Sequence, residues 1–407
     1  MKRDNKIWTI VVALVALCSC SQEAIIGDEE IPVPVAPEGY IFFDAAMKTN
    51  SRGTIMRDNL HADFSVLGYR YPATWSSAAT LAQQSSTISF TDNSGTLTSE
   101  YMGVFHPMVI VDDKETPSQL PTHQQVTWNG TTHSYTNPQE WENNLKYAFF
   151  AWYPATLVAN GGNSDLIGKP YITYTLPEGE DRVARQNMHD VLTAERIDYQ
   201  KRIYGASVVL NMKHRLAGLD IKAGSLINAK GLKETYGTKD ADNYVEAWDK
   251  ETLEDSEAVT LTISDFTLTL ENIKTSVKIE LNPDYSANGI SLTPSGSATK
   301  IYTGFEGTTG IGYYNSNADL KTLVGNDEKL ILIPQNDAIK VSMSMNYTIT
   351  CKGASKTLPA SVSGITIDKL EENNYYYLLL NFTKSGLFVK TQVTNLWEEK
   401  TIDHTFN

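Results

Sequence analysis

The chain has 407 residues, of which 41% are hydrophobic and 20% are charged, and this balance is typical of a folded globular protein. Acidic residues outnumber basic ones by 48 to 34, which gives a formal net charge of −14 at pH 7. A surface of this sign repels nucleic acid and anionic lipid, so general binding to either is excluded. The length exceeds that of one ordinary domain and predicts two.

The first nineteen residues have the anatomy of a secretory signal peptide. Lys2, Arg3 and Lys6 precede an apolar run over residues 7–17. This run is too short to cross a bilayer core, which needs about twenty residues. A basic start, a short apolar stretch and then small residues predict an exported protein with a signal peptide over residues 1–19.

The segment Leu17-Cys18-Ser19-Cys20 resembles the lipobox of bacterial lipoproteins, in which a small residue precedes the lipidated cysteine. Cys20 is therefore the predicted lipidation site, because bulky Leu17 would precede Cys18. The resemblance implies palmitate among the acyl chains, and several chains anchor a protein stably where one binds only marginally. An ordinary cleaved signal peptide with a coincidental cysteine is the alternative.

Residues 20–39 are predicted to form an extended tether. They contain three prolines and the acidic run Asp28-Glu29-Glu30, and proline-rich segments do not fold alone. The acidic run after the lipidated cysteine resembles the surface-export signal of Bacteroidales lipoproteins. A merely solvated linker explains the same composition.

From Tyr40 onward, short stretches rich in β-branched and aromatic residues are separated by turn residues such as Asp92-Asn93-Ser94-Gly95, and this pattern predicts strands. No long amphipathic helix separates them, so the pattern favours an all-β sandwich or Greek-key fold over a parallel sheet. The main predicted strands are residues 40–46, 63–71, 125–128, 146–153, 171–176, 208–211, 219–223, 259–263, 266–270, 276–281, 330–333, 340–350, 356–362, 375–382 and 388–393.

The strand pattern is interrupted once, over the polar and weakly periodic residues 224–257, which predict an interdomain excursion. The predicted N-terminal domain covers residues 40–223, and the predicted C-terminal domain covers residues 258–407. Cys351 lies in an apolar-polar alternation and is expected to be a small core side chain.

The sequence offers no recognisable catalytic motif. None of the seven histidines has a metal-ligand spacing, and there is no GxSxG, CxxC or Walker pattern. We therefore expect no enzyme activity, no catalytic residue, no metal and no cofactor, although folding can bring separate carboxylates together. The pair His189-Asp190 and, separately, His214 are expected to make structural hydrogen bonds. Trp75 and Trp248 lie in polar surroundings and are the tryptophans expected to be exposed.

Several segments resemble the fimbrillin-like proteins, the type V pilins of Bacteroidales. Residues 146–154, KYAFFAWYP, are similar to the Y-x-F-x-A-Y-Y-P strand of that family, although Trp152 replaces a commoner tyrosine. Residues 208–221 carry the order "strand, H-x-L-A-x-L-x-I". A tyrosine-rich stretch over residues 375–380 is followed by Val393 and Trp397, and Arg52 lies just after the first strand.

This resemblance implies two transthyretin-like Greek-key β-sandwich domains and a role as a stalk, anchor or tip subunit of an adhesive surface fimbria. It implies a lipidated precursor at the outer membrane, cut by an Arg-specific protease after Arg52, with Arg57 as the alternative. Loss of the first strand would open a groove that a segment of another fimbrial subunit, a second copy or a related pilin, fills. A monomeric surface lipoprotein that binds a glycan or host ligand is the alternative function.

The C-terminal segment over residues 386–407 is the predicted donor of that inserted strand. One alternating row is the more consistently aliphatic or β-branched and would face the groove. It consists of Leu387, Val389, Thr391 and Val393. The alternative is that these residues form the last strand of the chain's own C-terminal domain, because a two-residue period does not show which sheet a strand joins.

Overall fold

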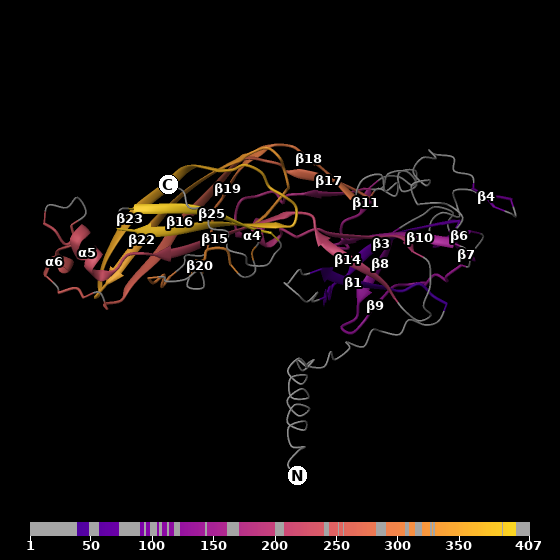
Figure 1. Ribbon diagram of the computed structural model, residues 1–407, viewed down its shortest axis with the longest axis horizontal. Coiled ribbons are helices and arrows are strands. Elements are labelled where there is room, and N and C mark those ends of the chain that lie inside the picture. Colours follow the sequence, from indigo (N-terminus) through magenta and orange to yellow (C-terminus); the bar gives the residue numbers. More distant parts are fainter. Residues whose placement is uncertain are drawn as a thin grey trace, which may run out of the picture.

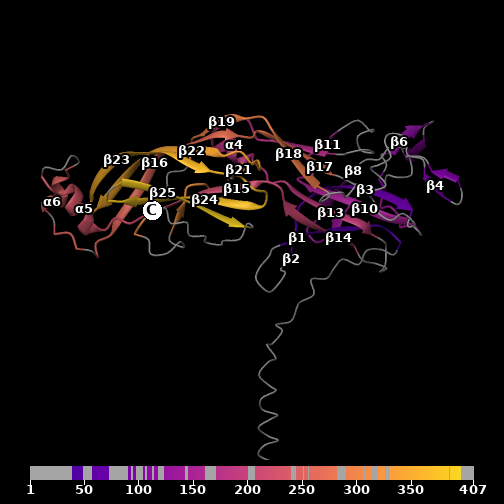
Figure 2. The same ribbon diagram turned by 45° about the horizontal axis from the view of Figure 1, so that its top comes forward.

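In the computed structural model, the chain is an elongated all-β body, which confirms the predicted fold class. Figures 1 and 2 show the early strands, β1 to β10, at one end and the late strands, β19 to β25, towards the other. The structure describes residues 39–48, 57–72, 90–92, 95–97, 104–105, 108–111, 114–117, 123–142, 145–160, 171–199, 207–239, 244–250, 252–254, 256–281, 290–305, 309–313, 320–325, 328, 330–384 and 386–395.

The largest sheet has eight strands in the order β2-β1-β14-β13-β10-β3-β8-β9. All neighbours are antiparallel except β1 and β14, which run parallel. The strands are β1 (Phe43–Lys48), β2 (Arg57–Asn59), β3 (Phe64–Pro72), β8 (His123–Trp128), β9 (His133–Ser134), β10 (Leu145–Tyr153), β13 (Leu192–Tyr199) and β14 (Val208–His214).

This sheet curls until its last strand, β9, reaches β1 near the other edge. His133 on β9 lies 3.3 Å from the carboxylate of Asp44 on β1, measured from Nδ1 to Oδ1. The hydroxyl of Tyr135 donates a hydrogen bond of 2.7 Å to the carbonyl of Ile41. The curled sheet encloses one hydrophobic core, the N-terminal core, whose members include Ile41, Phe43, Ala45, Phe64, Val66, Phe105, Val126, Tyr135, Phe149, Ala151, Val208 and Leu210.

The other face of β3 and β10 packs into a second, larger core. Tyr69, Phe150 and Trp152 point into it and share it with a four-stranded sheet of order β11-β12-β17-β18. This alternation of buried side chains between two cores explains why β10 is apolar at nearly every position. The sheet contains β11 (Ala159–Asn160), β12 (Tyr171–Thr175), β17 (Ser276–Leu281) and β18 (Ile290–Ser295).

Two further sheets form the C-terminal sandwich on the same core. One has the order β20-β15-β24-β25 with β21 also paired to β15, and the other has the order β19-β16-β22-β23. Their strands are β15 (Ala217–Ser225), β16 (Val259–Ile273), β19 (Ala298–Tyr302), β20 (Lys321–Thr322), β21 (Leu330–Leu332), β22 (Ile339–Cys351), β23 (Ala354–Ile367), β24 (Asn374–Thr383) and β25 (Gly386–Asn395). Two small hairpins, β4 (Phe90–Asp92) with β5 (Gly95–Leu97) and β6 (Met108–Val111) with β7 (Lys114–Pro117), lie apart from these sheets.

The sheet pairing differs from the expected division into residues 40–223 and 258–407. Strand β15 was expected to close the first domain, but it pairs with β24 and β21 in a sheet of C-terminal strands. Strand β12 pairs in turn with β17 from the second half. Strand alternation gives each element but not its partner, so the sequence could not place this boundary.

The polar segment over residues 224–257 was expected to be an interdomain excursion, but its described residues after β15 form a cap on the distal end of the C-terminal sandwich (Figure 1). It connects β15 to β16 through two short helices, α5 (Ala229–Tyr236) and α6 (Glu246–Lys250). Asn228 caps α5 by accepting a hydrogen bond from the backbone of Gly231. Trp248 is fully buried and donates to the carbonyl of Cys351, so the expectation that it is exposed was wrong.

A buried ion pair fixes helix α4 (Arg182–Gln186), which precedes β13, against C-terminal segments. The Nε atom of Arg185 lies 2.6 Å from Glu328, and both side chains are fully buried. The guanidinium also donates to the carbonyls of Thr303 and Gly304 and lies 3.9 Å from the ring centre of Phe305. Burying such a pair is costly unless its hydrogen bonds are satisfied, as those of Arg185 are here.

Cys351 is buried as expected, and burial raises the pKa of its thiol.

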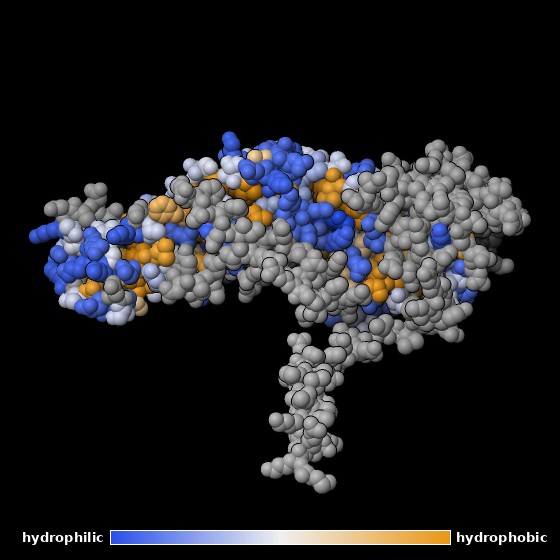
Figure 3. Space-filling view, in the orientation of Figure 1, coloured by the Kyte–Doolittle hydropathy of each residue, from blue (hydrophilic) through white to orange (hydrophobic). Residues whose placement is uncertain are grey.

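Within the described part of the chain, no helix is long and apolar enough to cross a membrane. The same residues contain no cluster of three His, Cys, Asp or Glu side chains that could hold a metal ion. Hydrophilic side chains cover much of the described surface on the face in Figure 3, with hydrophobic patches between them.

Candidate functional site

Strand β1 closes the curled N-terminal sheet. It pairs with β14 from Phe43 opposite Val208 to Met47 opposite Met212. Its other side meets β2 only near its end, where Ala46 lies opposite Asn59. Just before β1, the backbone N–H of Ile41 donates to the carbonyl of Gln139 over 2.7 Å. Strand β1, the first described strand, is therefore the place where the curled sheet closes on itself, and we call this place the seam of the sheet.

The inward side chains of this segment are anchored in the N-terminal core. Ile41 and Ala45 are fully buried, and Phe43 is 2% exposed. The Phe43 ring meets Phe149 edge-on at 5.0 Å between ring centres and lies 5.8 Å from Tyr135. Burial raises the pKa of Tyr135 to about 12, so its hydroxyl stays protonated and donates to Ile41. Burying one phenylalanine contributes about 1.5–3 kcal/mol, so Phe43 is a principal anchor.

The carboxylate of Asp44 on β1 makes a polar contact with the imidazole ring of His133. Its side chain is 22% exposed, whereas that of its partner His133 is only 1% exposed. An ionised carboxylate can only accept hydrogen bonds, so the Nδ1 atom of His133 carries the donated proton. The His133 ring packs against Phe64 at 5.1 Å and Trp128 at 4.8 Å. Its Nε2 atom is buried and finds no hydrogen-bond partner among the described residues.

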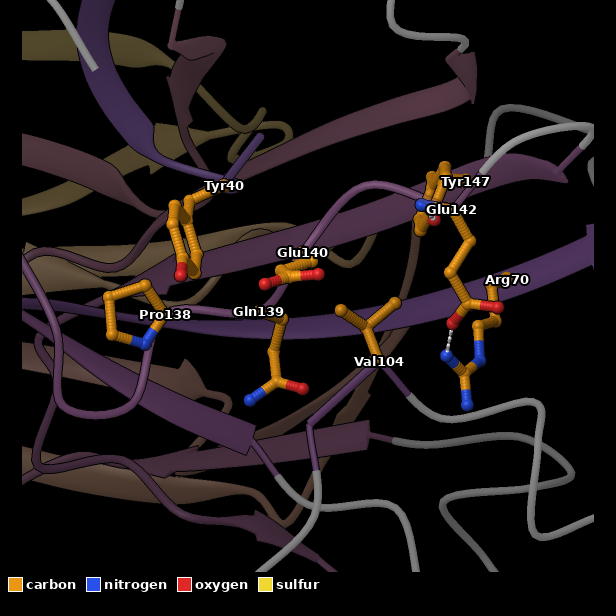
Figure 4. A pocket seen from close by; sticks show the side chains of 8 residues that line it. All are labelled: Tyr40, Arg70, Val104, Pro138, Gln139, Glu140, Glu142 and Tyr147. Atoms are coloured by element: carbon orange, nitrogen blue, oxygen red, sulfur yellow. Dashed lines mark hydrogen bonds and ion pairs between the residues drawn. The ribbon is translucent and has the colours of Figure 1, made fainter. Parts of the chain in front are cut away.

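A polar cavity of about 330 Å³ opens where the chain enters β1 (Figure 4). Arg70 forms an ion pair with Glu142 at one side of it. The hydroxyl of Tyr147 accepts a hydrogen bond of 2.9 Å from the backbone N–H of Glu142, and burial raises the pKa of this tyrosine to about 12. The lining residues are Tyr40, Arg70, Val104, Pro138, Gln139, Glu140, Glu142 and Tyr147.

The predicted donor residues lie in β25, which pairs with β24 along ten residues. Leu387, Val389 and Val393 pack against the larger core, whereas Phe388 on the opposite row is 58% exposed. In this single chain, the segment thus completes its own domain, which is the alternative that the sequence left open. Among the described strands β25 pairs only with β24, so it is an edge strand. Thr391 lies opposite Leu378.

Cys20 and Arg52 lie outside the described residues, as does Trp75. Arg57 begins β2 and pairs with Lys48 at the end of β1, so Arg52 falls between these two strands in the sequence. His214 and Asp190, for which structural hydrogen bonds were expected separately, bond to each other. The Asp44–His133 contact was missed, because a two-residue strand such as β9 gives no periodic signal.

Comparison with known proteins shows the fold. No family model matches the chain, and no curated protein matches it. A fimbrial protein from Bacteroides vulgatus has a similar structure, with 14% sequence identity, a TM-score of 0.51, and 88% of this chain and 99% of that chain covered. A proposed cell adhesion protein from Bacteroides ovatus is 11% identical, with a TM-score of 0.42 and coverage of 89% and 99%. The expected resemblance to fimbrial proteins is thus confirmed at the level of the fold.

Opposite rows of β25 should respond differently to a charge. Val393→Asp places a carboxylate against the larger core and should lower the free energy of unfolding by about 2 kcal/mol. Phe388→Asp puts the same group at a position that is 58% exposed and should change it by less than about 0.5 kcal/mol. Urea unfolding followed by circular dichroism measures both. Equal effects would show that β25 does not pack on its own domain in solution.

Proposed function

We propose that this protein is a structural subunit of an adhesive cell-surface fimbria and assembles by strand exchange in its N-terminal domain. The observation that carries the proposal is the position of β1. One short segment near the N-terminus supplies Ile41, Phe43 and Ala45 to the N-terminal core. Its ladder with β14 and the contact with Gln139 close the sheet, so one cut after β1 would make this closure removable.

Loss of β1 would leave backbone groups without hydrogen-bond partners and core side chains without cover. Backbone groups of β14 would lose their partners, among them the N–H of Val208, which donates to the carbonyl of Phe42 over 2.7 Å. The aromatic side chains around Phe43 would be uncovered as well. An open strand edge over a bare core favours insertion of an extended segment from another chain, which restores both main-chain and side-chain contacts.

The fold similarity to a Bacteroides fimbrial protein supports this proposal, since that neighbour is nearly fully covered. Other fimbrial subunits are accordingly the proposed partners, and the cell surface is the proposed location. The N-terminal sequence adds lipid anchoring at Cys20 in the outer membrane before cleavage. The proposal includes no catalytic activity and no cofactor.

For the donor, we propose β25, with the row Leu387, Val389, Thr391 and Val393, acting on a neighbouring subunit. Its place at the edge of a sheet and near the C-terminus supports this choice. Because three of these side chains pack on the larger core, donation requires β25 to leave β24 first. The exchange then depends on the neighbour's groove offering at least comparable burial.

A monomeric surface lipoprotein that binds a glycan is the second candidate, and the cavity beside Tyr40 is the observation that favours it. A tyrosine ring with nearby amide, carboxylate and guanidinium groups suits a saccharide, which combines apolar faces with hydroxyls. The two candidates differ in the fate of Tyr40. Cleavage after Arg52 would remove it in the first, whereas the second needs it to stay.

Lipid anchoring can be tested at the two adjacent cysteines. Cys20→Ala should move the protein out of the membrane fraction or leave an unprocessed precursor, because the acyl chains have no other attachment point. Cys18→Ala is the matched control and should leave fractionation unchanged. Membrane fractionation with mass spectrometry of the N-terminus measures both variants. The assignment is wrong if Cys18→Ala releases the protein and Cys20→Ala does not.

Cleavage can be tested with purified precursor and an Arg-specific protease. The first new N-terminus should be Gly53, or Asp58 if Arg57 is the site, because sequences of small polar residues that join two strands are common cleavage sites. Arg52→Gln should block the first product and Arg57→Gln the second, while Arg70→Gln, a change inside β3, should alter neither. A precursor that stays intact, or that is cut first at a described residue other than Arg57, would contradict the proposal.

A further inference from the structure

The structure also specifies which strand can replace β1. We define the β1 slot as the space bounded by β14, by β2 and by residues 133–139. We propose that this slot selects a segment with a large aliphatic, an aromatic and a small residue at alternate positions and an oxygen acceptor between the last two. Strand β25 of a second copy of this chain lacks this pattern, so the donor we propose is a segment of a different subunit. The inference rests on strand exchange as the proposed function.

The inward positions of Phe43 and Ala45 differ in the volume that they leave for a side chain. Phe43 lies among aromatic rings, with Phe149, Tyr135 and Phe105 at centre distances of 5.0, 5.8 and 6.0 Å. A smaller residue at this position would leave a cavity lined by these rings. Ala45 is fully buried in the same core, so a larger residue there would overpack it. The slot thus favours an aromatic residue followed, two positions later, by a small one.

Asp44 lies between these two positions and faces His133. The His133 side chain is almost completely buried, and its Nδ1 atom lies 3.3 Å from the Asp44 carboxylate, to which it donates in the tautomer that carries a proton on Nδ1. An incoming carboxylate or side-chain amide oxygen accepts this proton. An incoming lysine ammonium carries only donors and would leave the buried Nδ1–H without an acceptor or force the other tautomer. His133 therefore distinguishes an oxygen acceptor from a cation at this position.

The main-chain contacts of the slot do not discriminate in this way. The carbonyl of Phe42 accepts from Val208, and the carbonyl of Ala45 accepts from Leu60 over 2.9 Å. Any extended peptide presents the same carbonyls. Affinity for a strand in general comes from this ladder, and selectivity comes from the side-chain positions.

The chain's own β25 does not satisfy the slot in any of three registers. With Leu387, Val389 and Thr391 in place of Ile41, Phe43 and Ala45, Lys390 falls on the Asp44 position. A shift by two residues brings Gln392, an acceptor, to that position but puts Thr391 among the aromatic rings. A shift by one residue turns Lys390 into the core. Strand β25 of a second copy is thus a poor donor for this slot, while it can still serve a slot of another subunit.

The test uses full-length precursor cleaved by the Arg-specific protease and freed of its N-terminal fragment, together with fluorescent synthetic peptides. The peptide of residues 38–48 should bind, and its Asp44→Asn form should bind within about threefold, because the amide keeps an acceptor oxygen. The Asp44→Lys form and the β25 peptide of residues 386–395 should bind at least about tenfold more weakly. Fluorescence anisotropy gives all four dissociation constants.

The outcomes separate the inference from the function on which it rests. If no peptide binds, the original sequence included, strand exchange itself fails. If all four bind within threefold of one another, exchange stands and the selectivity proposed for the slot is wrong.

A second measurement on the uncleaved full chain does not depend on cleavage. Asp44→Lys should lower the melting temperature more than Asp44→Asn does. In a His133→Gln background this difference should shrink, because a glutamine amide can present either its oxygen or its N–H groups. An unchanged difference in that background would overturn the role assigned to His133.

Discussion

The packing of Phe43 among Phe149, Tyr135 and Phe105 is the interaction on which the N-terminal half of this protein depends. The side chain comes from a short strand near the start of the chain, but its partners come from the centre of the sheet and from the segments that close it. A strand that contributes this much burial cannot leave without a replacement. Strand β1 runs parallel to β14. Residues 49–56 connect it to β2 in the sequence, so a single cut there would separate β1 from the strands that follow.

The two halves of the molecule differ in how removable their strands are. The larger core receives side chains from both halves, and the Arg185–Glu328 pair ties α4 to C-terminal segments. In contrast, the N-terminal core is enclosed almost entirely by one curled sheet with one seam. Opening that seam therefore affects the N-terminal core first, while the sandwich of β15, β16, β22 and β24 keeps its own pairing. This asymmetry suits a subunit whose N-terminal domain accepts a strand while the C-terminal sandwich, apart from its edge strand β25, stays paired.

Much of the strand content follows from the sequence, because alternation and turn residues are local signals. Strand β10 was predicted as residues 146–153 and is Leu145–Tyr153, and β12 was predicted as residues 171–176 and is Tyr171–Thr175. The partners of these strands do not follow, since β15 looks like any half-buried strand until β24 is placed beside it. Trp248 was misjudged for the same reason: its polar neighbours in sequence are the exposed side of α6, and its burial depends on distant residues such as Cys351. The Asp44–His133 contact joins residues 89 positions apart, and no local sequence pattern predicts it.

Hydrogen–deuterium exchange of the cleaved protein tests the central claim, that β1 closes the N-terminal core, most directly. Backbone amides of β14 and β13 should exchange much faster once the N-terminal fragment is removed, because the ladder and the aromatic packing around Phe43 are lost. Amides of β16 and β22 should stay protected, and the intact precursor provides the reference. Unchanged protection of β14 after complete removal of the fragment would contradict the account, since the sheet would then be closed by something other than β1.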